Sequence, residues 1–401
     1  MTIPRTLLVT HYPPGMRNGS MVHVLAAIEA FGDQLVWFST KSPASLDGGR
    51  RDPAEVPMPP IPWACGHVPT RPSREPFRSW RIHAVLGPWA HKLGRDAALF
   101  GREHGVELVW GEMSLEAVTA ARVAAERLGV PLAVTAFDDP PTLLRHRGYR
   151  AYTRRAFERS YQRSLAAASS VGVISDAMAA DYRRRYGVDA DVLYVGVDPD
   201  AVLEAPTSAP DPTSTVTIGS VGSIVSEANW WTLIEALDRL DRDGSNPHLR
   251  ILHVGPLPER FHHPRVDSTG WVSGEAYRRA VARFDLCFLN LWFEPELAYW
   301  SATAFPTKLT TFLESQRPVI AFGPVDASVI RWVGEQGIGA VCPTPDAGAL
   351  AETIRALVLD EQRYCDTIAA MRDMASTVSR PRYVEAVAAF LDRALIDRAK
   401  G

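Results

Sequence analysis

The 401-residue sequence has few cysteines and no long apolar run. Its four cysteines, Cys65, Cys287, Cys342 and Cys365, are far apart and form no CxxC pair. This spacing argues against a zinc site or a disulfide framework and favours a reducing, cytoplasmic setting. The N-terminal segment holds only the short apolar run LLV, and no apolar stretch of about 18 residues follows it. We therefore expect neither a signal peptide nor a transmembrane segment.

The chain also lacks an excess of positive charge, and it has few lysines. The chain has 43 Lys and Arg against 46 Asp and Glu, a net charge of -3, so we expect no bulk binding of nucleic acid. Lysine occurs only at positions 41, 92, 308 and 400, and the arginine bias is typical of a GC-rich, bacterial genome. Position 308 nevertheless has lysine, which indicates a specific role for its ammonium group.

Short apolar runs alternate with helical patterns along the whole chain. The strands expected in the first half are residues 6–10, 35–39, 107–111, 132–137, 170–175 and 192–196, and helical periodicity is clear at 21–31 and 116–129. The strands expected in the second half are residues 216–222, 250–255, 266–272, 286–291, 318–323 and 340–343. Continuous apolar strands separated by helices predict parallel sheets that are covered on both faces.

We therefore predict an α/β fold with two Rossmann-like, doubly wound parallel-sheet domains that face a central cleft. The expected domains are residues 1–198 and 215–378, joined by a Pro-, Ser- and Thr-rich linker at 199–214. A C-terminal helix at 379–401 is expected to pack back on the N-terminal domain. Because ligands collect at the carboxyl ends of the strands in such folds, the cleft is the expected active site.

The stretch AFPTKLTTFLESQRP, residues 304–318, places a lysine where a helix is expected to begin. Pro306 fits the first helical position, and the following apolar residues form one face. Lys308 then lies in the first turn, where the positive end of the helix dipole disfavours a cation by about 0.3–1 kcal/mol. Some other group is expected to compensate this charge.

Several fragments follow one another in a specific order: NGSMVHVLAAIEA, GVPLAVTAFDDPP, SDAMAADYRRRYG, VLYVGVDPD, GSVGSI, HVGPL, TGWVSGEAYRRAVARFDL and FPTKLTTFLESQRPVIAFGP. In this order the chain resembles retaining GT-B glycosyltransferases of the family 4 type over nearly its whole length. The resemblance implies that a sugar moves from a nucleoside-diphosphate donor on the C-terminal domain to a hydroxyl acceptor on the N-terminal domain. It also implies that no metal or cofactor is needed, because helix N-termini and basic side chains offset the diphosphate charge.

The resemblance further implies donor contacts from Gly19, Ser20, Gly222, Ser223, Val272, Glu294, Glu296, Thr307, Lys308 and Thr311. Lys308 would meet the donor phosphate, and the alternative is a solvated lysine on a short loop. Ser20 is equally interpreted as an ordinary N-cap, Gly222 as a tight turn and Val272 as part of the core. Glu294 and Glu296 lie in an aromatic-rich loop that either holds the donor sugar or packs on the surface.

Three departures from the family pattern stand out. Ser223 stands where the family has an Arg, and Ala228-Asn229 falls where Lys-Gly is usual, so the cation pair that grips the diphosphate is missing. Thr311 replaces the ribose-binding glutamate, and Glu314, one turn later, is interpreted as non-catalytic. Lys308 is the expected replacement for the missing cations, with Arg317 and Arg331 as further candidates.

The N-terminal domain has its own catalytic candidates. Phe137 stands where the family often has histidine, and Asp138 remains to position an acceptor hydroxyl or accept its proton. Asp139 is better explained as part of an Asp-Pro turn. His11 is either an acid/base group or a buried structural histidine, and Glu112 is either a site residue or a helix N-terminal carboxylate. The proline-rich segment 43–76 is assigned to the acceptor, with disorder as the alternative.

Two rival hypotheses stay open. The missing cations also fit a catalytically silent GT-B relative that serves as a binding or scaffold subunit. A nucleotide-sugar epimerase shares the same architecture. The acceptor, whether a glycan, a lipid-linked or a small molecule, stays open, as do peripheral membrane contact and the oligomeric state.

Overall fold

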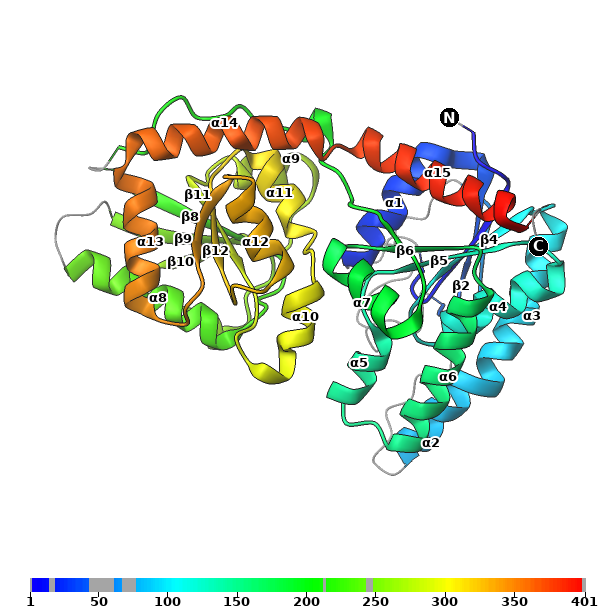
Figure 1. Ribbon diagram of the computed structural model, residues 1–401. Helices are drawn as coiled ribbons and strands as arrows, with labels where there is room; N and C mark the ends of the chain where they lie inside the picture. Colours follow the sequence, from blue (N-terminus) through cyan, green and yellow to red (C-terminus); the bar gives the residue numbers. More distant parts are fainter. Residues whose placement is uncertain are drawn as a thin grey trace. The chain divides into compact units, whose positions relative to one another are not determined.

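The computed structural model describes residues 2–13, 19–42, 61–66, 77–211, 214–242 and 248–398. The chain divides into two compact units, each built around one parallel sheet (Figure 1). Unit 1 comprises Met1–Tyr194 and Tyr383–Gly401, and unit 2 comprises Val195–Arg382. The predicted fold class, two parallel-sheet α/β domains, is confirmed.

Unit 1 contains a seven-stranded sheet in the order β3-β2-β1-β4-β5-β6-β7, in which neighbouring strands are parallel. The strands are β1 (Thr6–Thr10), β2 (Leu35–Ser39), β3 (Trp63–Cys65), β4 (Leu108–Glu112), β5 (Leu132–Ala136), β6 (Ser170–Val173) and β7 (Asp191–Val192). Every residue of β1, β2, β4, β5 and β6 is buried, which explains why these strands have continuous apolar runs.

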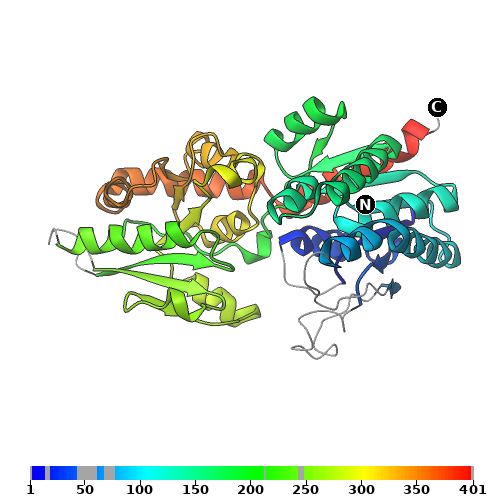
Figure 2. The same ribbon diagram turned by 90° about the horizontal axis from the view of Figure 1, so that it is seen from below.

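Helices cover both faces of this sheet (Figures 1 and 2). They are α1 (Gly19–Phe31), α2 (Phe77–Ala84), η5 (Val85–Trp89), α3 (Ala90–Glu103), α4 (Leu115–Leu128), α5 (Pro140–His146), α6 (Ala151–Ala167), α7 (Asp176–Tyr186) and α15 (Arg380–Arg398), with the short turn η1 (Gly32–Gln34). The Trp110 ring lies 6.4 Å from the Phe390 ring of α15, whereas a Cβ on Gly111 would lie 2.5 Å from Ala121 of α4. Consecutive strand residues point to opposite faces, so α15 and α4 cover opposite sides of β4.

Unit 2 contains a six-stranded parallel sheet in the order β10-β9-β8-β11-β12-β13. Its strands are β8 (Thr215–Val221), β9 (His248–Val254), β10 (Val266–Ser268), β11 (Leu286–Asn290), β12 (Val319–Phe322) and β13 (Gly339–Cys342). The sheet order reverses between β8 and β11. In sheets of this type that reversal marks the place where ligands bind, beyond the carboxyl ends of the two strands.

Two apolar clusters lie on the two faces of this sheet. One joins α8 and α13 to the strands through residues such as Leu233 and Leu350, and the other joins α11 and α12 through Leu309, Phe312 and Ile330. The helices and helical turns of unit 2 are η6 (Pro199–Ala201), α8 (Glu227–Arg242), η7 (Glu259–Phe261), α9 (Gly274–Val281), η8 (Pro295–Leu297), α10 (Ala298–Thr303), α11 (Lys308–Ser315), α12 (Ser328–Glu335), α13 (Ala347–Leu359) and α14 (Glu361–Thr377).

Several element boundaries differ from the sequence-based expectation. The strand expected at 266–272 covers only Val266–Ser268. The strand expected at 192–196 is shorter. The Leu193 N–H still donates to the Val173 carbonyl at 2.8 Å, but the backbone then leaves the sheet and Val197 bridges Ser379. The helix expected to start at Pro306 starts at Lys308, with Thr307 as its N-cap. Pro306 lies just before the cap, where its carbonyl accepts a hydrogen bond from the Leu309 N–H at 3.0 Å. Lys308 is thus the first residue of the helix.

The segment that follows Tyr194 packs closely against the start of α15. The Val197 N–H donates to the Val378 carbonyl at 2.8 Å, and the Arg380 N–H donates to the Val197 carbonyl at 2.7 Å. A Cβ on Gly196 would lie 2.0 Å from the backbone carbonyl carbon of Ser379. Only glycine permits this approach.

We expect Gly196→Ala to lower the thermal midpoint, because the new methyl group would meet backbone rather than a flexible side chain. Overpacking of this kind costs about 1–3 kcal/mol. The control is Gly87→Ala, where a Cβ would meet nothing within 4 Å. Differential scanning fluorimetry compares the two variants, and equal midpoints would show that the contact at Gly196 is unimportant.

Candidate functional site

His11 follows β1 directly and is held by two glutamates. Its backbone N–H donates to Glu112 Oε2 at 3.0 Å, and its Nδ1 lies 2.9 Å from Glu116 Oε1. The Thr40 hydroxyl also donates to Glu116 Oε1, at 2.9 Å. His11 is 3% exposed and Glu116 is 1% exposed. A histidine held at Nδ1 by a carboxylate has a fixed ring orientation, which is the arrangement that positions a general base.

The charges around this pair support an ionised Glu116. Burial alone would raise the pKa of Glu116, but the charge and hydrogen bond of His11 and the charge of Lys41 outweigh burial and lower it. Burial lowers the pKa of Lys41, although Glu116 opposes that shift. The Lys41 ammonium lies 5.0 Å from the centre of the Tyr12 ring, and burial followed by the charge of Glu112 raises the pKa of Tyr12. These groups form one charged cluster at the carboxyl ends of β1, β2 and β4.

Asp138 follows β5 at the same edge of the sheet and its side chain is exposed. Partial desolvation by the surrounding protein, followed by the charges of Glu112 and Asp139, raises the pKa of Asp138 to about 6. The Arg147 guanidinium acts in the opposite direction. A carboxylate with a pKa near that value is better suited to accept a proton at neutral pH than an ordinary aspartate.

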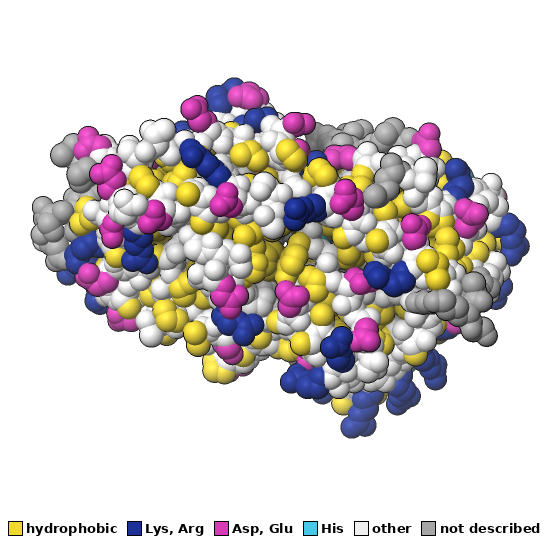
Figure 3. Space-filling view, turned by 45° about the horizontal axis from the view of Figure 1, so that its top comes forward, with side chains coloured by type: hydrophobic (Ala, Val, Ile, Leu, Met, Phe, Trp, Pro, Cys, Tyr) yellow, Lys and Arg dark blue, Asp and Glu magenta, His cyan; other side chains and the backbone are white. Residues whose placement is uncertain are grey.

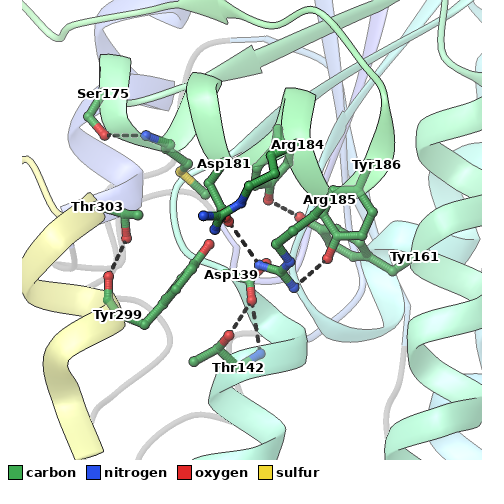
Figure 4. Close-up of polar contacts among 12 residues, drawn as sticks. Asp139, Thr142, Tyr161, Ser175, Asp181, Arg184, Arg185, Tyr186, Tyr299 and Thr303 are labelled. Atoms are coloured by element: carbon green, nitrogen blue, oxygen red, sulfur yellow. Dashed lines mark hydrogen bonds and ion pairs between the residues drawn. The ribbon is translucent and has the colours of Figure 1, made fainter. Parts of the chain in front are cut away.

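Asp139 has a structural role that the turn interpretation predicted. It is the N-cap of α5, and its Oδ2 accepts a hydrogen bond from the Thr142 N–H at 3.0 Å (Figure 4). The guanidinium of Arg185, on α7, lies 3.3 Å from Asp139 Oδ1 and donates to Asp181 at 3.0 Å and to the Tyr186 hydroxyl at 2.7 Å. This network joins α5 to α7 and leaves Asp138, one residue earlier, at the surface.

A second histidine, His23, packs against Phe137, the residue that stands where the family often has histidine. His23, on α1, is buried, and its ring centre lies 4.7 Å from that of Phe137. Burial lowers its pKa to about 3, so the ring is neutral. The Tyr383 hydroxyl of α15 donates to the His23 carbonyl at 3.0 Å. His23 was missed because it belongs to the apolar face of a helical pattern.

In unit 2, Lys308 folds back over the glycine turn that follows β8. Its ammonium donates to the Ser223 carbonyl, and a Cβ on Gly222 would lie 3.7 Å from Lys308 Cε. Gly222 has φ 73°, a conformation that favours glycine, and its N–H donates to the Val254 carbonyl at 2.9 Å. Lys308 is half-buried, and burial lowers its pKa to about 8. Among the described residues, the Ser223 carbonyl is the partner that offsets the unfavourable position of the Lys308 charge at a helix N-terminus.

His253 lies beneath this turn and was not singled out from the sequence. It is the penultimate residue of the apolar strand β9, is fully buried, and its Nδ1 lies 3.2 Å from the Ser220 hydroxyl. Burial, followed by the charge of Lys308, lowers the pKa of His253 to about 4. The ring is therefore neutral, and Lys308 remains the cation of this turn.

The loop after β11 contains a buried carboxylate oxygen. Glu294 Oε1 accepts a long hydrogen bond from the Ser226 hydroxyl at 3.4 Å, whereas Oε2 is buried and has no partner among the described residues. The Trp292 indole donates to the Val225 carbonyl at 3.0 Å and orders the start of the loop. An unsatisfied buried acceptor is costly, which makes Glu294 Oε2 a candidate ligand contact.

Asn229 and Thr311, at two positions that depart from the family pattern, have structural partners. The buried Asn229 amide donates to the Leu291 carbonyl at 2.7 Å and thereby ties α8 to the loop after β11. The Thr311 hydroxyl lies 2.8 Å from the Tyr277 hydroxyl of α9. Asn229 is therefore a packing residue.

Glu314 and Arg317 also have structural partners. Glu314 Oε1 accepts a hydrogen bond from the Asp198 N–H at 3.1 Å, and its backbone carbonyl accepts one from the Leu203 N–H at 2.8 Å. Burial raises the pKa of Glu314 to about 7. Arg317 Nε donates to the Phe284 carbonyl at 2.7 Å. Both residues anchor neighbouring backbone.

The remaining candidates lie on the same elements. Glu296 is exposed in η8, Thr307 is the half-buried N-cap of α11, and Val272 packs against the core of unit 2. Gly19 and Ser20 open α1. Most of the segment 43–76 lies outside the described residues.

Within the described parts of the chain, no group of three or more His, Cys, Asp or Glu is arranged to hold a metal ion. The same residues include no helix that is both long enough and apolar enough to cross a bilayer.

Comparison with protein families identifies both halves of the chain. A model described as a glycosyl transferase 4-like domain matches residues 16–197, and a model described as glycosyl transferases group 1 matches residues 215–360. The chain belongs to the GT-B glycosyltransferases. It is thus an enzyme of the transferase class, as the fragments predicted. No curated protein sequence matches it significantly.

Solved structures share this GT-B fold at low sequence identity. HepE from Anabaena, in complex with UDP and glucose, is 15% identical over 97% of this chain and 99% of that chain, with a TM-score of 0.67. Sucrose-phosphate synthase from Thermosynechococcus elongatus is 14% identical over 97% and 98%, with a TM-score of 0.68. A UDP-forming α,α-trehalose-phosphate synthase from Burkholderia xenovorans, in complex with glucose-6-phosphate, is 11% identical over 97% and 100%, with a TM-score of 0.65.

Proposed function

We propose that this GT-B glycosyltransferase transfers a sugar from a nucleoside-diphosphate donor to a hydroxyl acceptor, with retention at the anomeric carbon and without a metal ion. The observation that carries the proposal is the Lys308 ammonium held over the Gly222 turn. UDP in the HepE complex and the UDP-forming synthase support UDP as the first nucleotide to test.

The turn suits a diphosphate because it combines a cation with exposed backbone. An ammonium has three N–H donors, and the Ser223 carbonyl accepts one of them, which leaves two for phosphate oxygens. The absence of a Cβ at Gly222 allows an anion to approach the backbone. The N–H groups of Leu309 and Thr310 already donate to Pro306 and Thr307, so the ammonium supplies more of the stabilisation than the helix end does.

Glu294 is proposed to bind the donor sugar. Its buried Oε2 has an unused acceptor site, and a sugar hydroxyl would satisfy it. The same loop presents the Trp292 ring, whose apolar face suits a pyranose. Thr311 is proposed to share its hydroxyl with the donor ribose, because it is only half-buried beside Tyr277.

Asp138 is proposed to position the acceptor hydroxyl and accept its proton, since its pKa is raised to about 6. The His11–Glu116 pair fixes the neighbouring backbone and ring. Lys308 stabilises the charge that develops on the leaving diphosphate, so electrostatics and positioning supply most of the catalysis. No covalent nucleophile is invoked.

Incubation of the enzyme with UDP-, GDP- and dTDP-sugars and a panel of hydroxyl acceptors tests this proposal. The expected result is an acceptor-dependent product whose anomeric configuration, read by NMR, matches that of the donor. Turnover of donor alone to an epimer would overturn the transfer reaction. Absence of binding to every nucleotide would overturn catalysis altogether and favour a scaffold role.

Donor affinity is expected to fall as pH rises above about 8. The pKa of Lys308 is lowered to about 8, so the free protein loses the ammonium above that pH, and affinity then falls by about tenfold per pH unit. Calorimetric titration with UDP across this range measures the effect. Lys308→Arg is the control, because guanidinium stays protonated and its affinity should stay flat. A parallel decline in both proteins would assign the pH dependence to another group.

A further inference from the structure

Unit 1 has a concentrated basic surface on α5, α6 and the loop between them. Residues 140–163 contain seven arginines and one acidic residue, Glu158, in a chain whose net charge is -3. Most of the face in Figure 3 shows acidic and basic side chains interspersed, with dark blue side chains gathered at its lower right. Because the whole chain is acidic, this local excess of positive charge does not follow from its composition.

Five of these arginines are exposed and define what we call the basic face: Arg145, Arg150, Arg155, Arg159 and Arg163. Arg147 is also exposed but interacts with the charge of Asp138, so it is not counted here. On α6, Arg155, Arg159 and Arg163 recur every four residues and therefore lie along one stripe of the helix. The opposite side of α6 packs inward through Phe157 and Tyr161. Within the described residues, no ion pair neutralises any of these five guanidinium groups.

Two exposed aromatic side chains adjoin the basic face. Tyr152, at the start of the same stripe, is 46% exposed, and Trp80 of α2 is 68% exposed. The His83 ring, one turn after Trp80 on α2, lies 5.5 Å from the Tyr152 ring. This contact places α2 beside the N-terminal end of α6 and brings both aromatics to the edge of the basic face.

We propose that the basic face docks on a membrane surface of anionic phospholipids. Clusters of four to eight basic residues on a helix are attracted to anionic headgroups by about 1 kcal/mol per residue. Exposed Trp and Tyr add an apolar body with a polar tip, which suits the headgroup boundary. The positive charge of the arginines favours anionic over neutral lipid. The two aromatic side chains add an apolar contribution to binding that the arginines alone would not provide.

The arrangement favours lipid over nucleic acid. Domains that bind nucleic acid are usually basic overall, whereas this chain has a net charge of -3 and a pI near 6.4. The docking surface involves residues of unit 1 alone and no residue of the Lys308 turn. Its failure would therefore leave the proposed transfer reaction intact.

Co-sedimentation of the full-length protein with vesicles tests the inference. The protein should bind vesicles of phosphatidylcholine mixed with phosphatidylglycerol, bind pure phosphatidylcholine weakly, and dissociate as salt is raised. Arg150→Glu/Arg155→Glu/Arg159→Glu should weaken binding to the mixed vesicles by on the order of a hundredfold or more. The matched control is Arg278→Glu/Arg279→Glu/Arg283→Glu, the same charge change on three exposed arginines in and just after α9 of unit 2. Thermal midpoints verify that both variants fold.

Equal binding of the two triple variants, or equal binding of the wild type to both kinds of vesicle, would overturn the inference. Trp80→Ala/Tyr152→Ala should weaken binding several-fold and leave its salt dependence in place. Unchanged binding of this variant would contradict insertion of the aromatics. An RNA oligomer that displaces the protein from vesicles and binds it more tightly than lipid would reassign the basic face to nucleic acid.

Discussion

Lys308→Ala is expected to weaken the binding of UDP by about one to two orders of magnitude. A charge-assisted hydrogen bond contributes about 1.5–3 kcal/mol, and the described residues provide no second cation at the Gly222 turn, where His253 is neutral. The effect on turnover should be larger still, because the leaving diphosphate gains charge in the transition state. Isothermal titration calorimetry with UDP measures the first effect and initial rates measure the second.

Lys92→Ala provides the matched control for loss of one lysine. Lys92 is exposed on α3 and paired with Asp96 at 2.6 Å, so its removal should leave UDP affinity and stability almost unchanged. Lys308→Ala should also fold normally, because burial makes the ammonium costly to keep charged. Wild-type affinity in Lys308→Ala would remove this residue from the donor site.

The sheets were predictable from sequence because their signal is local. Strands such as β1 and β12 are short apolar runs buried on both faces, and each is visible within five residues of sequence. The length of β7 was overestimated for the same reason. The run VLYVG is apolar, but its backbone leaves the sheet after Leu193, and the following Val197 bridges Ser379, far away in sequence. Apolar character predicts burial and does not reveal the pairing partner.

A site residue was predictable from sequence only where its unusual feature is visible within a single helix or strand. Lys308 stood out because a cation at a helix start conflicts with the local dipole. Glu116 carries no such conflict, since an acidic residue in the first turn of α4 is favourable by itself. Its hydrogen bond to His11 joins residues 105 positions apart in sequence, and helical or strand periodicity gives no information on contacts over that separation. His253 was hidden in the same way by the apolar strand around it.

Glu116→Leu is expected to destabilise unit 1 by about 3–5 kcal/mol, the cost of removing one partner from a buried charge pair. The substitution leaves the His11 ring and the Thr40 hydroxyl without their shared acceptor, and it removes the negative charge that interacts with Lys41. Urea unfolding followed by tryptophan fluorescence measures the shift in midpoint. Glu126→Leu is the control, because Glu126 lies on the same helix and is 54% exposed in its pair with Arg122.

The stability of the double variant His11→Leu/Glu116→Leu distinguishes the contribution of the His11–Glu116 interaction from the contributions of the two side chains individually. If the pair is coupled, the double variant should lose less stability than the sum of the two single variants, because no uncompensated group stays buried. Additive losses would show that the two side chains act independently and that Glu116 does not hold the His11 ring.

The stabilisation from Glu116 should also disappear in acid. Its pKa is lower in the folded protein than its ordinary value of 4.5, so the folded state binds this proton less readily than the unfolded state does. The contribution is therefore fully present above pH 4.5 and is lost as pH falls through the folded value. Thermal midpoints of wild type and Glu116→Gln should converge over that acidic range, since glutamine does not titrate. A constant difference between them at all pH values would mean that the charge of Glu116 contributes nothing and that only its hydrogen bonds matter.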